Sequence, residues 1–347
     1  MDTQTVSGIA RDDLNRWLAR HVRGARPPFD YELIAGGRSN LTYVVTDADG
    51  RRFVLRRPPL GHVLESAHDM RREFRIISAL AATVVPVPRP LAFCAEPTIT
   101  DQPFYVMEFV DGVVVRDQGD AERHLDDAWR AEAGRSLIDV LAALHALDPR
   151  QVGLDDLGRS QGYVERQLRR WYGQFQKSKS REIRALDEAH ARLVAHVPPQ
   201  RRSSIVHGDF RLGNCVMSPA GEVRAVLDWE LCTIGDPLAD VGWLAAYWGE
   251  PDESTAHVLD GVPTNARGFA PPQALVERYV ERTGADVSDL DFYVALAFWK
   301  LACIGEGVYA RYRAGVMGDS GPADIEGFGE QVERLAGHAL AVTDRLG

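Results

Sequence analysis

Residues 204–217 read SIVHGDFRLGNCVM and place a polar, glycine-containing segment between two short apolar runs. This pattern predicts a strand, a loop rich in hydrogen-bonding groups and a second strand. Loops held between rigid elements are frequent sites of binding and catalysis. His207, Asp209 and Asn214 are therefore candidate functional residues.

A further carboxylate follows one short turn later. Residues 218–222 separate the second strand from a third that ends directly before Asp228, and a hairpin there would bring Asp228 beside Asn214. Oxygen ligands of this kind suit Mg²⁺, which binds one or two carboxylates together with substrate phosphates. In phosphoryl transfer one Asp orients the attacking hydroxyl, while an Asn and a second Asp hold the metal. The H-x-D-x-x-x-x-N spacing is also that of the protein-kinase catalytic loop.

The composition is that of an ordinary globular protein. The 347 residues are 45% hydrophobic and 26% charged, and this length predicts one two-lobed unit or two domains. A formal net charge of −10 argues against a nucleic-acid binder and a basic membrane-surface protein. The four cysteines lie far apart without a C-x-x-C pair, which predicts buried, reduced thiols. With no signal-peptide pattern and no uninterrupted apolar run of about 18 residues, we expect a soluble, cytoplasmic protein with no membrane or nucleic-acid partner.

The periodicity of apolar residues changes along the chain. An amphipathic helix is expected over 11–22, then short strands at 31–37, 41–46 and 51–56, a helix over 67–82, and strands at 91–94 and 103–110. After about residue 120 the pattern is mostly helical, with helices expected over 121–147, 161–178, 185–197, 236–248, 272–283, 289–314 and 323–345. We predict an α+β protein with a β-rich lobe over 1–111, a hinge at about 107–112, and a mostly helical lobe over 112–347.

Two longer stretches carry a resemblance to a known family. VHGDFRLGN (206–214) followed by AVLDWELCTIGDPLADVGWL (225–244) resembles the aminoglycoside phosphotransferase and choline kinase branch of the protein-kinase-like fold. The resemblance extends to the first lobe, where GGRSNLTYVV resembles the phosphate loop and FVLRRPP the third strand. HDMRREFRIISAL resembles the helix that supplies the pairing Glu, and FYVMEFVDG resembles the hinge. Phrases such as SAHDMRREFRIISAL and GVYARYRAG are closest to the sub-branch found fused to acyl-CoA dehydrogenases.

This resemblance implies a two-lobed protein-kinase-like fold and an ATP- and Mg²⁺-dependent phosphotransferase acting on a small-molecule hydroxyl. Asp209 would be the catalytic base, and Asn214 and Asp228 the metal ligands. The expected nucleotide contacts are the backbone of Gly36, Gly37, Ser39 and Asn40 at the phosphates, Arg56 paired with Glu73, Val54 over the adenine, and the backbone of Glu108 and Val110 at its edge. The sub-branch points to hydroxyacyl-CoA-type acceptors.

Arg56 departs from the Lys usual at its position, and this departure keeps a weakly catalytic nucleotide-binding module open as an alternative. An aminoglycoside kinase is a second alternative, but the candidate acceptor segments 161–181 and 305–313 carry more basic than acidic residues. Simpler roles also compete: a hairpin turn at 36–40, an exposed strand Arg56, a solvated Glu73 and a plain inner strand at 107–110.

Supporting roles are expected for three neighbouring residues. His207 should hydrogen-bond the loop backbone, Asp236 should cap a helix, and Asp240 should lie one turn later under the loop. A Ser204–His207–Asp209 hydrolase relay is disfavoured, because residues so close in sequence cannot align and no nucleophile elbow surrounds Ser204. Tyr309 and Arg311 could serve the acceptor pocket or the core and surface.

Overall fold

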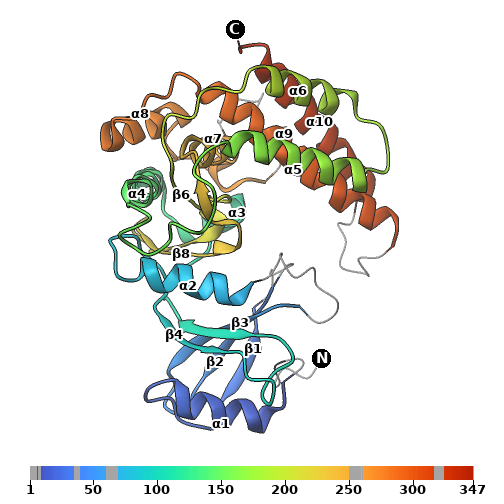
Figure 1. The fold of residues 1–347 in the computed structure, drawn as a ribbon. Helices are drawn as coiled ribbons and strands as arrows, with labels where there is room; N and C mark the ends of the chain where they lie inside the picture. Colours follow the sequence, from blue (N-terminus) through green and yellow to red (C-terminus); the bar gives the residue numbers. More distant parts are fainter. Residues whose placement is uncertain are drawn as a thin grey trace. The chain divides into compact units, whose positions relative to one another are not determined.

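The computed structural model describes residue 6 and residues 9–34, 40–59, 69–249, 259, 261–315 and 324–346. The chain forms two compact units (Figure 1). The first consists of Met1–Gly112 with Arg224–Glu230, and the second of Val113–Val223 with Leu231–Gly347. The segment that carries Asp228 thus groups with the first unit, although it lies far along the chain.

The first unit is built on a five-stranded antiparallel sheet. Its spatial order is β1 (Asp30–Leu33), β2 (Leu41–Thr46), β3 (Arg52–Arg57), β5 (Phe104–Glu108) and β4 (Pro90–Cys94). In the β2–β3 turn, Asp47 accepts hydrogen bonds from the N–H groups of Asp49 and Arg51, and Gly50 adopts a left-handed φ of 79°.

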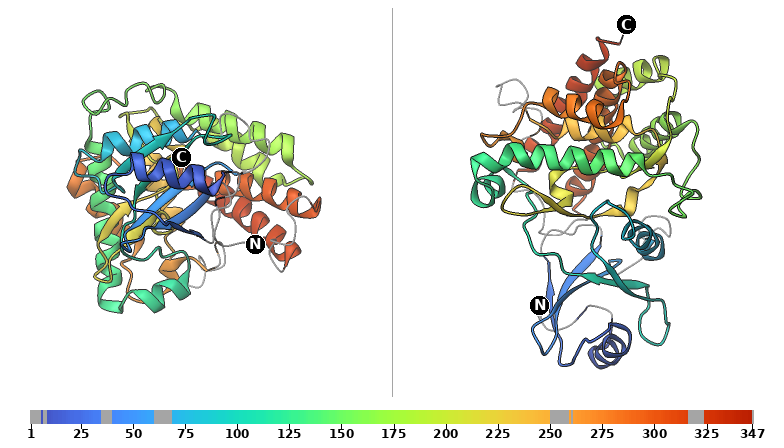
Figure 2. Two further views of the ribbon diagram at one scale, coloured as in Figure 1. Left: turned by 90° about the horizontal axis from the view of Figure 1, so that it is seen from below. Right: turned by 90° about the vertical axis from the view of Figure 1, so that its left-hand side faces the viewer.

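Successive side chains of β3 point to opposite faces of the sheet, and the two faces have different surroundings. Phe53 and Leu55 point into an apolar core that includes residues of α1 (Arg11–His21), which lies along one side of the sheet in Figure 2. Val54 and Arg56 point to the opposite face, where Arg56 meets α2 (Met70–Leu80). Asp69 begins α2 by accepting a hydrogen bond from the N–H of Arg72. The sheet therefore separates a structural core from a polar face.

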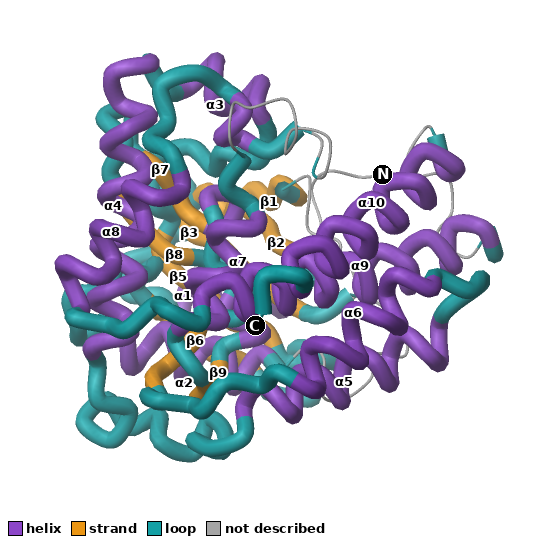
Figure 3. The backbone as a smooth tube through the Cα atoms, turned by 90° about the horizontal axis from the view of Figure 1, so that it is seen from above, coloured by secondary structure: helices purple, strands orange, loops and turns teal. Residues whose placement is uncertain are grey.

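The second unit is mainly helical. A long helix, α9 (Leu290–Arg313), packs against α5, α6, α7 and α10, as the tube in Figure 3 shows. The helices are α3 (Gln118–His124), α4 (Asp127–Ala146), α5 (Tyr163–Ser178), α6 (Arg184–Ala195), α7 (Leu238–Ala246), α8 (Pro272–Thr283), α9 and α10 (Ile325–Thr343). By length and composition α9 could cross a membrane, but 83% of its most apolar window is buried, which is typical of a core helix.

Two features of this unit correct the sequence prediction. The single helix expected over 121–147 is two helices, because the buried Leu125 and the following Asp126 adopt extended backbone between α3 and α4. A short strand, β9 (Thr233–Gly235), was not predicted, and it pairs antiparallel with β6 (Ser204–Val206). The four cysteines are free and buried, as expected.

Candidate active site

The polar segment after β6 forms the predicted loop between strands. It ends in a 3₁₀ turn, η1 (Leu212–Asn214), which leads into β7 (Cys215–Met217). Gly208 has a φ of 85°, and a Cβ there would lie 2.9 Å from the Cβ of Leu231 and 3.0 Å from its carbonyl oxygen. Only glycine fits this backbone without displacing its neighbours.

Asp209 is held by donors on both of its carboxylate oxygens. Oδ1 accepts from the indole Nε1 of Trp243 at 2.7 Å and from Nε of Arg211 at 3.2 Å, and Oδ2 accepts from Nδ2 of Asn214 at 2.7 Å. Charge-assisted hydrogen bonds of this kind are roughly twice as strong as neutral ones. The carboxylate is therefore fixed in orientation, which is what positioning an attacking hydroxyl requires.

The 3₁₀ turn explains how Asn214 reaches back to Asp209. Its Nδ2 also donates to the main-chain oxygen of Asp209 at 2.8 Å. Both bonds use the amide nitrogen of Asn214, and no donor among the described residues hydrogen-bonds its amide oxygen. An amide oxygen in this state suits the predicted role of metal ligand.

Asp240 holds the loop backbone from helix α7. Its carboxylate accepts from the N–H of His207 at 2.6 Å and of Gly208 at 2.8 Å, and Nε2 of His145 lies 3.3 Å away. Burial alone would raise the pKa of Asp240, but His145, His207 and the N–H of Gly208 lower it below its ordinary value. The predicted position of Asp240 under the loop is confirmed.

The two other supporting roles are also visible. The buried imidazole of His207 accepts from the N–H of Asp209 through Nδ1 at 3.2 Å, so this side chain stiffens the loop. Asp236 accepts from the N–H of Leu238 and from the hydroxyl of Tyr293. Helix α7 begins at Leu238, not at 236, and Pro237 occupies the N-cap that was predicted for Asp236. Asp236 still bonds the first N–H group of the helix from one position earlier. Ser204 donates to the main-chain oxygen of His145, which leaves no hydrolase relay with His207.

In the first unit, Arg56 lies between two carboxylates. Its Nε is 3.0 Å from Oε2 of Glu73, and its Nη2 is 2.5 Å from Oδ1 of Asp228. Burial opposes the charge on Arg56, but Glu73, Tyr105 and Asp228 outweigh it and raise the pKa of Arg56 above its ordinary value. The predicted ion pair with Glu73 is confirmed, and the exposed-strand interpretation of Arg56 is wrong.

Glu73 has further partners on the same face. The hydroxyl of Tyr105 donates to its Oε2 at 3.0 Å, and Nδ2 of Asn40 lies 3.4 Å from its Oε1. The same amide nitrogen of Asn40 is 3.4 Å from Oε2 of Glu230. Glu73 is 2% exposed, so it is a member of a buried polar network rather than a solvated helix residue.

Asp228 has an unusual backbone conformation. Its φ of 63° makes it the one non-glycine residue with a positive φ in the part of the chain that the structure describes. Asp tolerates the left-handed region better than most residues, and such positions cluster at functional sites. Its Oδ1 is engaged by Arg56, and no hydrogen bond from a described residue reaches Oδ2. No local sequence pattern predicts this conformation.

The remaining predicted nucleotide contacts are only partly described. Val54 lies beside Val44 and Met107 in the sheet and is mostly buried. The N–H of Glu108 donates to the main-chain oxygen of Arg89 at 2.8 Å, and Val110 follows β5 in irregular structure. Gly36, Gly37 and Ser39 lie outside the described residues. The adenine and phosphate roles of these residues stay predictions.

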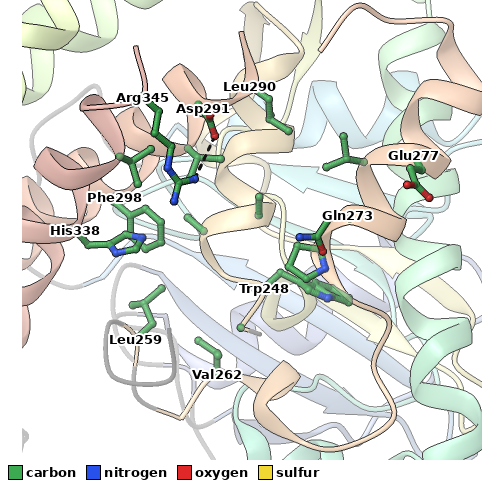
Figure 4. Close-up of a pocket in the computed structure, with 17 residues that line it drawn as sticks. Trp248, Leu259, Val262, Gln273, Glu277, Leu290, Asp291, Phe298, His338 and Arg345 are labelled. Atoms are coloured by element: carbon green, nitrogen blue, oxygen red, sulfur yellow. Dashed lines mark ion pairs between the residues drawn. The ribbon is translucent and has the colours of Figure 1, made fainter. Parts of the chain in front are cut away.

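Two of the cavities in the second unit adjoin each other, and the smaller of these two is lined by residues of the loop. One, of about 240 Å³, is lined by Arg116, Arg211 and Gly213 among others. A larger one, of about 610 Å³, shares Trp248, Leu259 and Val262 with it and is lined mostly by apolar side chains (Figure 4). At the far side of the larger cavity, Arg345 and Asp291 face each other at 3.8 Å.

The residues singled out near 305–313 belong elsewhere. Tyr309 is 1% exposed and its hydroxyl donates to Glu326, so it is a core residue. Arg311 is exposed on α9. Neither is among the described residues that line the two cavities.

Comparisons with known proteins identify the family of this chain. Residues 30–286 match the model of the phosphotransferase enzyme family. Acyl-CoA dehydrogenase family member 11 of Rattus norvegicus is 36% identical over 96% of this chain, which spans 43% of that relative. The chain thus covers less than half of the length of this curated relative.

Solved structures of phosphotransferases and kinases also resemble this chain. A crystal structure from Ralstonia eutropha, assigned to the aminoglycoside phosphotransferases, is 31% identical, with a TM-score of 0.80 over 97% of this chain and 99% of that one. Choline kinase of Cryptosporidium parvum has a TM-score of 0.68 at 11% identity, with 97% and 96% covered. The amicoumacin kinase hAmiN, solved with AMP-PNP and Ca²⁺, has a TM-score of 0.60 at 14% identity, with 93% of each chain covered. The chain therefore belongs to the phosphotransferase enzyme family and has the protein-kinase-like α+β fold.

Proposed function

We propose that this protein transfers the γ-phosphate of ATP, with Mg²⁺, to a hydroxyl of a small molecule, and that Asp209 is the base that orients that hydroxyl. The observation that carries this proposal is the carboxylate of Asp209, fixed by Trp243, Arg211 and Asn214. Phosphoryl transfer depends mainly on positioning and charge neutralisation, and a rigidly held carboxylate supplies the first of these.

The metal is proposed from the chemistry of two side chains. Asn214 offers an amide oxygen and Asp228 a second carboxylate oxygen, and both are oxygen donors of the type that Mg²⁺ prefers. Among the described residues no three His, Cys, Asp or Glu side chains gather into a metal cluster. A bound Mg²⁺ would neutralise the phosphate charge, and Arg56 would add the charge of its guanidinium.

We further propose a hydroxyacyl-CoA-type acceptor. The smaller cavity beside the loop has Arg116 and Arg211, and no Asp or Glu, among its described lining residues. Arginines favour an anionic group, whereas a polycationic aminoglycoside would require carboxylates. The adjoining apolar cavity offers space for a hydrocarbon portion of the acceptor.

ADP release tests this proposal. Mg-ATP is supplied with hydroxyacyl-CoAs, aminoglycosides, choline or sugars, and Asp209→Asn is measured in parallel. We expect hydroxyacyl-CoAs to stimulate ADP release and Asp209→Asn to reduce kcat by about 10²- to 10⁴-fold, the usual contribution of general acid–base catalysis. Stimulation by aminoglycosides alone would reject the acceptor. ATP binding without turnover in any mixture would favour the weakly catalytic module.

A further inference from the structure

A buried lysine lies beneath the catalytic loop, in a place that phosphoryl transfer does not by itself explain. Lys300 comes from α9, is 8% exposed, and donates through Nζ to the main-chain oxygen of Gly208 at 3.0 Å. The same Nζ lies 4.0 Å from the ring centroid of Trp243 and 5.4 Å from that of Trp171. An ammonium group in such a place is costly unless it is compensated.

Trp243 links this lysine to Asp209. Its indole N–H donates to Oδ1 of Asp209 at 2.7 Å, while the face of its ring receives the ammonium of Lys300. A cation over an indole withdraws electron density from the ring, and hydrogen bonds in such a chain strengthen one another. The N–H is therefore a stronger donor to the carboxylate when Lys300 is charged.

Helix α7 holds the loop at two points. Asp240 and Trp243 are one turn apart, so both side chains lie on the face of α7 that meets the loop. Asp240 fixes the main chain at His207 and Gly208, and Trp243 fixes the carboxylate of Asp209. Lys300 completes the support, because it holds the carbonyl of Gly208, whose N–H is held by Asp240.

We propose that Trp243 and Lys300 are positioning residues for the phosphoryl transfer: Trp243 fixes the carboxylate of Asp209, and Lys300 acts through the ring of Trp243 and the carbonyl of Gly208. This inference rests on the proposed role of Asp209 as base. It adds two residues that lie 34 and 91 positions from Asp209 in the sequence.

The charge of Lys300 gives the proposal a pH dependence. Burial lowers the pKa of Lys300 to about 8, against the opposing effect of Asp209 and Asp240, while Arg170 of α5 lowers it further. Lys300 lines a cavity of about 20 Å³ together with Asp240, Tyr163 and Tyr293, and burial raises the pKa of both phenols. Lys300 is the group among these whose charge changes near pH 8.

Kinetics of four variants test the proposal, with Mg-ATP and a hydroxyacyl-CoA as acceptor. We expect Trp243→Phe to lower kcat by about 10- to 100-fold, the range for losing a hydrogen bond to a charged group, with KM for ATP within about twofold. In the wild type we expect kcat to fall above pH 8, where Lys300 loses its charge. Lys300→Met should lower kcat by about tenfold, the loss of one hydrogen bond to a charged group, and should lack this fall. Asp209→Asn provides the inactive reference. The matched control is Trp299→Phe, which removes a buried indole N–H that donates to the main-chain oxygen of Leu186.

A second measurement does not need turnover. The indole N–H signal of Trp243, assigned by its loss in Trp243→Phe, should shift in Asp209→Asn and in Lys300→Met, and should titrate near pH 8 in the wild type. If Trp243→Phe keeps the wild-type kcat while Asp209→Asn is inactive, the positioning role is overturned and the proposed function stands. If wild type and Asp209→Asn turn over equally, the proposed function fails, and an indole signal indifferent to both substitutions then rejects the positioning contacts as well.

Discussion

The clusters around Asp209 and around Arg56 both hold charged side chains in a fixed position, but with different kinds of partner. Around Asp209 two of the three side-chain donors are neutral, the indole of Trp243 and the amide of Asn214, and the third is the guanidinium of Arg211. Around Arg56 the charge is balanced by opposite charge, from Glu73 and Asp228. Neutral donors fix one carboxylate and leave its charge available for chemistry. An ion cluster instead holds groups whose partners can be exchanged for a charged ligand.

The largest change in unfolding free energy is expected from removing Arg56, the cation that Glu73 and Asp228 share. Arg56→Met leaves Glu73, which is 2% exposed, without its counter-charge, and breaking a buried pair typically costs about 3 to 5 kcal/mol of unfolding free energy. Urea denaturation measures the loss, and Arg56→Lys is the control that keeps a positive charge. Equal stability of Arg56→Met and wild type would show that the ion cluster is not a buried electrostatic unit.

Lys300 gives the next largest effect, as a change of stability with pH. Its pKa is about 8 in the folded protein and 10.5 in the unfolded chain, so between these values the unfolded chain binds the extra proton. The unfolding free energy of the wild type should therefore rise with pH over this window, by up to about 3 kcal/mol. Lys300→Met should lack this rise. Parallel curves for the two proteins from pH 7 to 10 would contradict the burial of a charged lysine.

A substitution at Asp240 tests how much the neutral backbone donors of the loop contribute to stability. Asp240→Asn weakens the bonds to the N–H groups of His207 and Gly208 and should cost about 2 kcal/mol of unfolding free energy. Because the folded pKa of Asp240 is lowered, its stabilisation is present above the ordinary pKa of Asp and is lost as pH falls through the folded value. Denaturation at pH 7 and in acid should show a smaller acid loss for the variant. If Asp240→Asn loses as much unfolding free energy in acid as the wild type, that loss comes from other carboxylates.

The smallest effect is expected from a neutral donor placed inside the ion cluster. Tyr105→Phe removes only the hydroxyl that donates to Glu73, and should cost about 1 kcal/mol, since Arg56 still balances the carboxylate. Thermal unfolding of this variant beside Arg56→Met measures how unequally the two partners contribute. A loss as large as that of Arg56→Met would mean that the hydroxyl, not the guanidinium, is the main partner of Glu73.

Much of the fold and part of the site follow from local sequence. The β2–β3 hairpin is predictable because Asp47 and Gly50 supply the turn chemistry, and the loop at Asp209 because polar residues interrupt two apolar runs. The pairing of Arg56 with Glu73 came from family resemblance together with strand alternation. These features depend on neighbours along the chain or on a motif.

Other features depend on packing between distant segments. The break at Leu125 was missed because the helical pattern continues across it, and only the burial of Leu125 marks the turn. Trp243 and Lys300 look like ordinary core residues of apolar helices, and their relation to Asp209 exists only once α7 and α9 pack beneath the loop. No local pattern reports a contact of this kind.

The left-handed backbone of Asp228 has a practical consequence for mutagenesis. With a φ of 63°, alanine at this position would carry a conformational penalty of about 1 to 2 kcal/mol in addition to the loss of the carboxylate. Asparagine tolerates the same backbone, so Asp228→Asn changes the charge while leaving the main chain unstrained. The difference between the two variants measures the local strain, and the asparagine variant alone reports what the carboxylate does.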